Sequence, residues 1–192
     1  MLPRDMDPRM VFFAPQNGVV IDNVDPEGLY RVRVRIPGLI QRSSWAWPRA
    51  TMGGGSAQRG GVIVPAIGSD VVVTFLGGDP NRPLWEGAWW GKPPAGSEMP
   101  TPLRDLPPAE VPRVQCMQVG TVVITFDERE GQRKFSVEDL TSGDSVVLDL
   151  EKQGISINAT SALILKAVGA VSIDGAAVTI NGRVVRATGR AI

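Results

Sequence analysis

Histidine is absent from this sequence of 192 residues, and cysteine occurs only once. Without histidine the chain lacks the usual general base near neutral pH and the commonest ligand of transition metals. A single cysteine, Cys116, cannot form a disulfide within the chain, so synthesis in a reducing cytosol is the simpler expectation. These absences argue against most hydrolases and zinc sites. We therefore expect no catalytic residue, no metal site and no cofactor.

Net charge is also absent, because 20 Lys and Arg residues balance 20 Asp and Glu residues. A neutral chain has no overall attraction to polyanions, which argues against nucleic acid as a partner. Nowhere do about 18 apolar residues run together, and the charged N-terminus is not followed by an apolar leader segment. We expect neither a membrane-spanning helix nor a secretory signal.

Short alternating segments dominate residues 17–91 and predict strands. In residues 29–36, Tyr30, Val32, Val34 and Ile36 would share one face, and the intervening arginines a solvated or acid-paired face. The predicted strands are 18–22, 29–36, 45–50, 61–65, 70–76 and 84–90. Five or six short strands with little helical periodicity favour a small Greek-key barrel of the OB type.

The second half reads as a repeat. A proline-rich stretch, 92–113, predicts an extended linker. Segments 121–126 and 133–137 predict a hairpin, and further short strands are expected at 146–150, 154–158, 162–166, 170–174 and 177–181. Apolar pairs recur at steps of eight, eight and seven residues: Ile155/Ile157, Leu163/Leu165, Val171/Ile173 and Val178/Ile180. The repeat is too short to enclose its own core, so we expect three copies to bury these eight side chains around one axis.

Residues 64–87, VPAIGSDVVVTFLGGDPNRPLWEG, contain a specific motif. Its members are Pro65, Gly68, the alternating strand 71–75, Gly78, Asp79, Pro80, Arg82, Pro83 and Gly87. Asp79 can cap a turn, Pro80 pre-sets φ, and the glycines allow positive φ, so we expect a structural role for this motif. The motif resembles the OB-fold domain of phage baseplate spike and hub proteins, and of the related type VI secretion spike.

This resemblance implies an all-β chain, an OB-fold barrel followed by an intertwined trimeric β-helix. The expected divisions are an N-terminal arm (1–16) with a docking point at 11–13, an OB domain (17–91), a linker (92–113) and the β-helical spike (114–192). The chain would be a homotrimeric, non-enzymatic central spike of a contractile tail baseplate or a related injection machine. It would be made in the host cytoplasm and reside in the virion.

The resemblance also implies partners. The OB domain would attach to the tail hub and baseplate, and the needle would pierce the target cell envelope. Many such spikes end in a histidine-bearing, iron-binding tip. Because this chain has no histidine, either its tip is free of metal or a separate protein caps it.

Two other functions stay open. An OB module with an oligomerising tail could bind oligonucleotides or saccharides by stacking them on Trp45, Trp47, Trp85, Trp89 and Trp90, although neutral charge argues against it. An enzyme ranks third. The stretch between Trp90 and Val114 has no room for an inserted lysozyme domain, and acidic pairs such as Asp127 and Glu128 read as solvated turn residues.

Overall fold

The computed structural model describes residues 12–49, 52–87 and 89–185, in two compact units, Met1–Leu106 and Pro107–Ile192. Strands account for nearly all the regular structure, with three single-turn 3-10 helices beside them. The all-β prediction is therefore confirmed. In the described part of the chain, no helix has the length and apolar character needed to cross a membrane. The expected arm at 1–16 falls largely outside the described residues.

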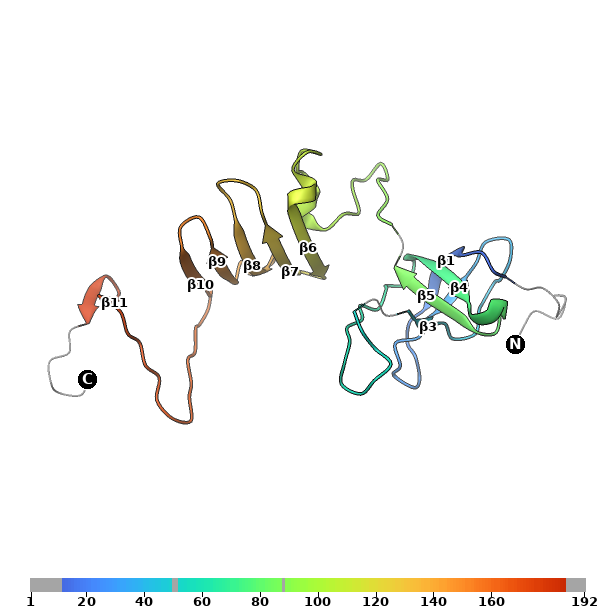
Figure 1. Ribbon diagram of the computed structural model, residues 1–192, viewed down its shortest axis with the longest axis horizontal. Helices are drawn as coiled ribbons and strands as arrows, with labels where there is room; N and C mark the ends of the chain where they lie inside the picture. Colours follow the sequence, from blue (N-terminus) through green and yellow to red (C-terminus); the bar gives the residue numbers. More distant parts are fainter. Residues whose placement is uncertain (1–11, 50–51, 88, 186–192) are drawn as a thin grey trace. The chain divides into compact units, whose positions relative to one another are not determined.

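The first unit contains one curled sheet of five strands in the order β2-β1-β4-β5-β3 (Figure 1). All neighbours are antiparallel except β3 and β5, which are parallel. One further antiparallel bridge, Val32 to Ala46, links the residue before β2 to the residue before β3. The two edges of the sheet thus approach each other, as in an OB-like half-barrel. The strands are β1 (Gln16–Asp22), β2 (Arg33–Arg35), β3 (Trp47–Pro48), β4 (Asp70–Phe75) and β5 (Pro83–Gly87).

The core of this unit follows from strand alternation. In β4, Val71, Val73 and Phe75 are buried, whereas the residues between them lie half-buried on the other face. Side chains at every second position of a strand share a face, so this pattern directs one face inward. The complete buried cluster is Val20, Val32, Val34, Ile36, Ile40, Ala46, Val71, Val73, Phe75 and Trp85.

Four predicted strands of the barrel differ from the structure. The strand expected at 45–50 is reduced to β3, and the strand expected at 84–90 corresponds to β5, which ends at Gly87. Tyr30 has a φ of 57° and is exposed, so the strand expected at 29–36 is reduced to β2, and Tyr30 does not share the inner face. Residues 61–65 form no strand, and Val62 and Ile63 are exposed. Val64 instead packs against the core, and the Pro65 carbonyl oxygen accepts a hydrogen bond from the Asn23 side chain, so this segment contacts the barrel without joining its sheet.

The second unit contains an antiparallel meander of five strands, which lie side by side in chain order (Figure 1). They are β6 (Val114–Val119), β7 (Val122–Asp127), β8 (Lys134–Asp139), β9 (Ser145–Asp149) and β10 (Gly154–Asn158). The predicted hairpin is confirmed as β7 and β8. A separate two-stranded hairpin follows, β11 (Val178–Ile180) and β12 (Arg183–Val185).

Between β10 and β11, residues 159–177 form no strand in the single chain. The strands expected at 162–166 and 170–174 are therefore absent here, and the trimeric β-helix remains a prediction. The linker is also not uniformly extended, because η2 (Thr101–Leu103) and η3 (Val111–Arg113) lie within 92–113. Each carries a proline in its first turn, where the fixed φ suits a helix start and no N–H is lost.

Candidate functional site: the barrel motif and the apolar face

The hairpin between β4 and β5 contains the central part of the predicted motif. Phe75 pairs with Pro83 where the two strands meet the turn, and the Leu76 N–H donates to the Arg82 carbonyl oxygen at 3.0 Å. The turn begins with η1 (Leu76–Gly78), in which Gly77 and Gly78 have φ of 65° and 77°. Only glycine adopts these angles without steric cost, which explains the glycine pair.

Asp79 shapes the rest of this hairpin. Its Oδ1 accepts hydrogen bonds from the Asn81 backbone N–H at 2.9 Å and from Asn81 Nδ2 at 3.2 Å. Its carbonyl oxygen accepts from the Arg82 N–H at 2.9 Å. This is an Asx turn, in which the carboxylate replaces a backbone acceptor. The arrangement holds the chain in a tight turn.

The other motif residues lie at the opposite end of β4. Gly68, with φ of 92°, donates its N–H to the Val20 carbonyl oxygen at 2.8 Å, and Asn23 Nδ2 donates to the Pro65 carbonyl oxygen at 3.0 Å. Gly87 pairs with Val71 at this same end. The motif thus comprises two turn regions at the two ends of β4, and it does not converge on a single pocket.

An ion pair whose partners the sequence analysis did not identify fixes the β1–β2 connection. Arg31 donates from Nη2 to Asp25 Oδ1 at 2.7 Å and from Nε to Oδ2 at 2.9 Å. Glu27 adds a second carboxylate at 2.9 Å from Nη2. The side chains of Arg31 and Asp25 are only 9% and 3% exposed. The expected acid-paired face is therefore realised for Arg31, in a largely buried site.

The guanidinium groups also stack on tryptophans. Arg33 lies 4.6 Å from the Trp45 ring centroid, and Arg31 lies 5.2 Å from that of Trp47 and 5.9 Å from that of Trp45. These distances suit cation–π attraction. Trp45 is thus already engaged by two arginines, and Trp85 is buried. Trp47 is likewise in contact with Arg31, so three of the five tryptophans proposed for base stacking already have partners within the fold.

The second sheet has one almost wholly apolar face. In antiparallel pairs, directly opposite residues lie on the same face, and Met117 pairs with Ile124, which pairs with Val137, which pairs with Val146, which pairs with Ile157. We call this surface the apolar face. It consists of Met117, Val119, Val122, Ile124, Phe126, Phe135, Val137, Val146, Leu148, Ile155 and Ile157, with Gln115 and Asp139 at its margins.

The opposite face of the same sheet is mainly polar. Its central row pairs Thr125 with Ser136 and ends at Ser156 on β10. The apolar face is nevertheless the more exposed of the two: Phe126 is 53% exposed, whereas Thr125 and Ser136 are buried. Exposing apolar side chains on an open sheet face to water is unfavourable, so we expect this face to be buried against another protein surface.

The eight residues predicted as a trimer core are mostly uncovered in the single chain. Seven of them are between 51% and 74% exposed, and Val178 is half-buried. Ile155 and Ile157 lie on the apolar face, whereas Leu163, Leu165, Val171 and Ile173 lie in the segment without strands. Their burial in an assembly remains a prediction. Sequence reasoning placed 146–150 in the repeat but missed that the apolar stripe continues through β6 to β8, where apolar residues also occupy every second position.

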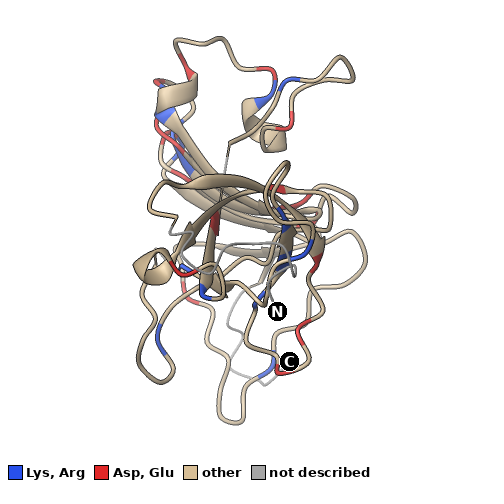
Figure 2. Ribbon diagram, turned by 90° about the vertical axis from the view of Figure 1, so that its right-hand side faces the viewer, with Lys and Arg blue, Asp and Glu red and all other residues tan. Residues whose placement is uncertain are grey.

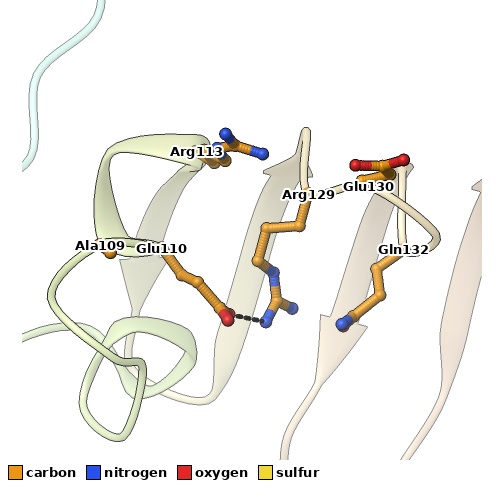
Figure 3. A pocket seen from close by; sticks show the side chains of 6 residues that line it. All are labelled: Ala109, Glu110, Arg113, Arg129, Glu130 and Gln132. Atoms are coloured by element: carbon orange, nitrogen blue, oxygen red, sulfur yellow. Dashed lines mark hydrogen bonds and ion pairs between the residues drawn. The ribbon is translucent and has the colours of Figure 1, made fainter.

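A polar cluster ties the end of the linker to this sheet (Figure 3). Arg129, in the β7–β8 turn, donates to Glu110 Oε2 at 2.9 Å and to Asp127 Oδ2 at 2.7 Å. The hydrogen bonds from Arg129 lower the pKa of the Asp127 carboxyl, against the opposing effect of burial. The neighbouring hollow has a volume of about 320 Å³ and is lined by Ala109, Glu110, Arg113, Arg129, Glu130 and Gln132. Both carboxylates of the cluster are used in anchoring Arg129.

Acidic and basic residues are interspersed along the ribbon (Figure 2). Within the described residues, no three His, Cys, Asp or Glu side chains come together as metal ligands would. Cys116 is half-buried, and burial raises the pKa of its thiol, which disfavours the reactive thiolate.

Comparison with known proteins gives the barrel a family. Residues 16–90 match the Type VI secretion system/phage-baseplate injector OB domain. The Type VI secretion system spike protein VgrG3 of Vibrio cholerae is 26% identical over 126 residues, 64% of this chain and 11% of that protein. The actin cross-linking toxin VgrG1 of Vibrio cholerae is 28% identical over 110 residues, 57% of this chain and 9% of that protein. The chain therefore spans about a tenth of the length of these relatives, and it carries the injector OB domain of the phage-baseplate and type VI secretion spike family.

Proposed function

We propose that this chain is the structural central spike of a contractile tail baseplate or a related injection machine, and that it acts as a homotrimer. The single observation that carries the proposal is the pairing of an injector OB domain at 16–90 with a following region whose apolar residues lie exposed. A strand region of this kind gains stability only when further chains cover it.

In this proposal the action is mechanical. Contraction of the sheath drives the trimer into the target envelope, and a ladder of interchain hydrogen bonds along the needle resists bending. The OB domain attaches to the tail hub, which places the protein in the baseplate. The motif residues of the β4–β5 hairpin serve this role by fixing the shape of the barrel, and no residue of this chain performs chemistry.

The toxin name of one relative does not carry over in this proposal. That protein is about ten times longer than the segment matched here, because the match covers 9% of it. An effector activity would need residues outside the matched segment. The proposal for this chain is therefore restricted to attachment and piercing.

The mass of the purified chain in solution tests this function. Light scattering of the full chain should give three times the chain mass, and a chain ending at Leu106 should give a monomer. A full-length monomer would contradict the spike proposal. Binding of single-stranded oligonucleotides that weakens steeply with salt would instead favour the OB-module alternative.

A further inference from the structure

The strands that carry the apolar face are paired within the single chain, whereas residues 159–177, which follow them, are not. Every strand from β6 to β10 has a hydrogen-bonded neighbour within the same chain. Residues 159–177 form no strand, and their apolar side chains Leu163, Leu165 and Ile173 are more than half exposed. The first region therefore presents a formed surface before any partner arrives, and the second does not.

We infer that the apolar face of β6 to β10 is the surface on which copies of this chain first associate, and that residues 159–177 take up strands only after that association. The number of copies rests on the proposed function. The order of events does not, because it follows from which region is already paired within one chain.

Another copy of this chain is the occupant that the apolar face fits. Between its margins the face has no charged side chain, and the one carboxylate at its margin, Asp139, accepts hydrogen bonds from the Thr141 N–H and Ser142 Oγ of its own turn. Identical faces therefore meet without an unpaired charge in the interior of the contact. A partner must also continue the alternating apolar pattern past Ile157 to Leu163 and Leu165. A second copy supplies the same pattern in the same order, as a closed symmetric assembly requires.

Entropy sets the order. Fixing the backbone of an unpaired residue costs conformational entropy, and residues 159–177 have no strand partner in the described part of their own chain to offset that cost. Strand formation by this segment therefore needs neighbouring chains that are already aligned. The apolar face requires no such ordering, since its strands are in register before association.

Three substitutions in the full chain separate these roles. Phe126→Asp places a charge on the apolar face, directly opposite Phe135. Ser156→Asp makes a matched change on the opposite face of the same sheet, at an exposed position. Ile173→Asp places the charge in the segment without strands. Each should be examined by light scattering over a range of concentrations and by hydrogen exchange, with the exchange protection of β6 to β10 confirming that the substituted sheet stays folded.

Phe126→Asp should raise the dissociation constant for self-association at least a hundredfold and leave residues 159–177 unprotected from exchange. Ser156→Asp should associate as the parent does. Ile173→Asp should still associate, with loss of exchange protection confined to the distal segment. A variant at Phe126 that associates normally while Ile173→Asp is monomeric would overturn the inference and leave the spike proposal intact. A parent chain that is itself monomeric would overturn both.

Discussion

Arg31 and Asp25 form a two-point ion pair that is almost closed to solvent. Asp25 also accepts hydrogen bonds from the backbone N–H groups of Glu27, Leu29 and Arg31, so one carboxylate organises the whole β1–β2 connection. The hydrogen bonds from Arg31 are the largest influence on this carboxyl and lower its pKa well below the ordinary value of 3.8, against the effect of burial. The positive φ of Tyr30 lies within this connection.

This pair predicts a dependence of stability on pH. A carboxyl whose folded-state pKa is lowered contributes stability above its unfolded pKa and loses it as pH falls toward the folded value. Asp25→Asn should lower the thermal midpoint of the first unit at pH 7, and the deficit should shrink progressively below about pH 4, near the ordinary value of 3.8. Calorimetry from pH 2 to pH 8 measures both effects.

Asp22→Asn is the matched control for that experiment. It makes the same chemical change, but the partner Arg42 is 57% exposed at its side chain. Surface pairs of this kind contribute at most about 1 kcal/mol. An equal loss in both variants at pH 7 would show that the Asp25 site is no more important than a surface pair.

Close packing at Gly18 gives a second prediction. A Cβ added there would lie 2.8 Å from Val73 Cγ2 in the core, and valine cannot turn away because its χ1 is restricted. Gly18→Ala should therefore lower the free energy of unfolding by about 1 to 3 kcal/mol. Gly87→Ala is the control, because its added Cβ would meet no described atom within 4 Å. Urea denaturation followed by tryptophan fluorescence reports on this unit, which contains all five tryptophans.

The Asx turn at Asp79 predicts a difference between two substitutions. Asp79→Ala removes the acceptor for the Asn81 N–H and should cost about 0.5 to 1.5 kcal/mol of stability. Asp79→Asn keeps an oxygen in the same place and should cost much less. The same urea titration measures both variants. If they lose the same stability, the negative charge, rather than the turn geometry, is what this position requires.

Phe12 and Phe13 give a prediction for the N-terminal segment. The Phe12 ring lies 5.4 Å from the Phe75 ring between centroids, and its N–H donates to the Gly78 carbonyl oxygen at 3.0 Å. Phe12→Ala should lower the free energy of unfolding by about 1 to 2 kcal/mol, because it removes an aromatic pair and part of the core cover. Phe13 is 82% exposed, so Phe13→Ala should change stability by less than about 0.5 kcal/mol. Equal effects would place the docking contact elsewhere.

Alternation alone was sufficient to locate most strands. The β4 segment and the β7–β8 hairpin were predictable because apolar and polar residues alternate there between clear turn residues. The prediction of a strand at 61–65 was wrong because an apolar run in a sequence does not reveal whether that segment will pair with another strand. The prediction that Tyr30 lies in a strand was wrong for a different reason. Tyr30 continues the alternating pattern, but the ion pair of Asp25 with Arg31 holds this part of the chain in a turn.

The sequence by itself determined the all-β class, the OB-type motif and the absence of histidine chemistry, because composition and period-two patterning act locally along the chain. Only the tertiary structure decided which arginine is buried, where the motif residues lie, and that the apolar stripe crosses five strands from Met117 to Ile157. Those features depend on strand register, which brings together residues far apart in the chain. The tertiary structure also decided that the apolar pattern of residues 159–177 does not form strands in the single chain, because none of the described strands pairs with this segment.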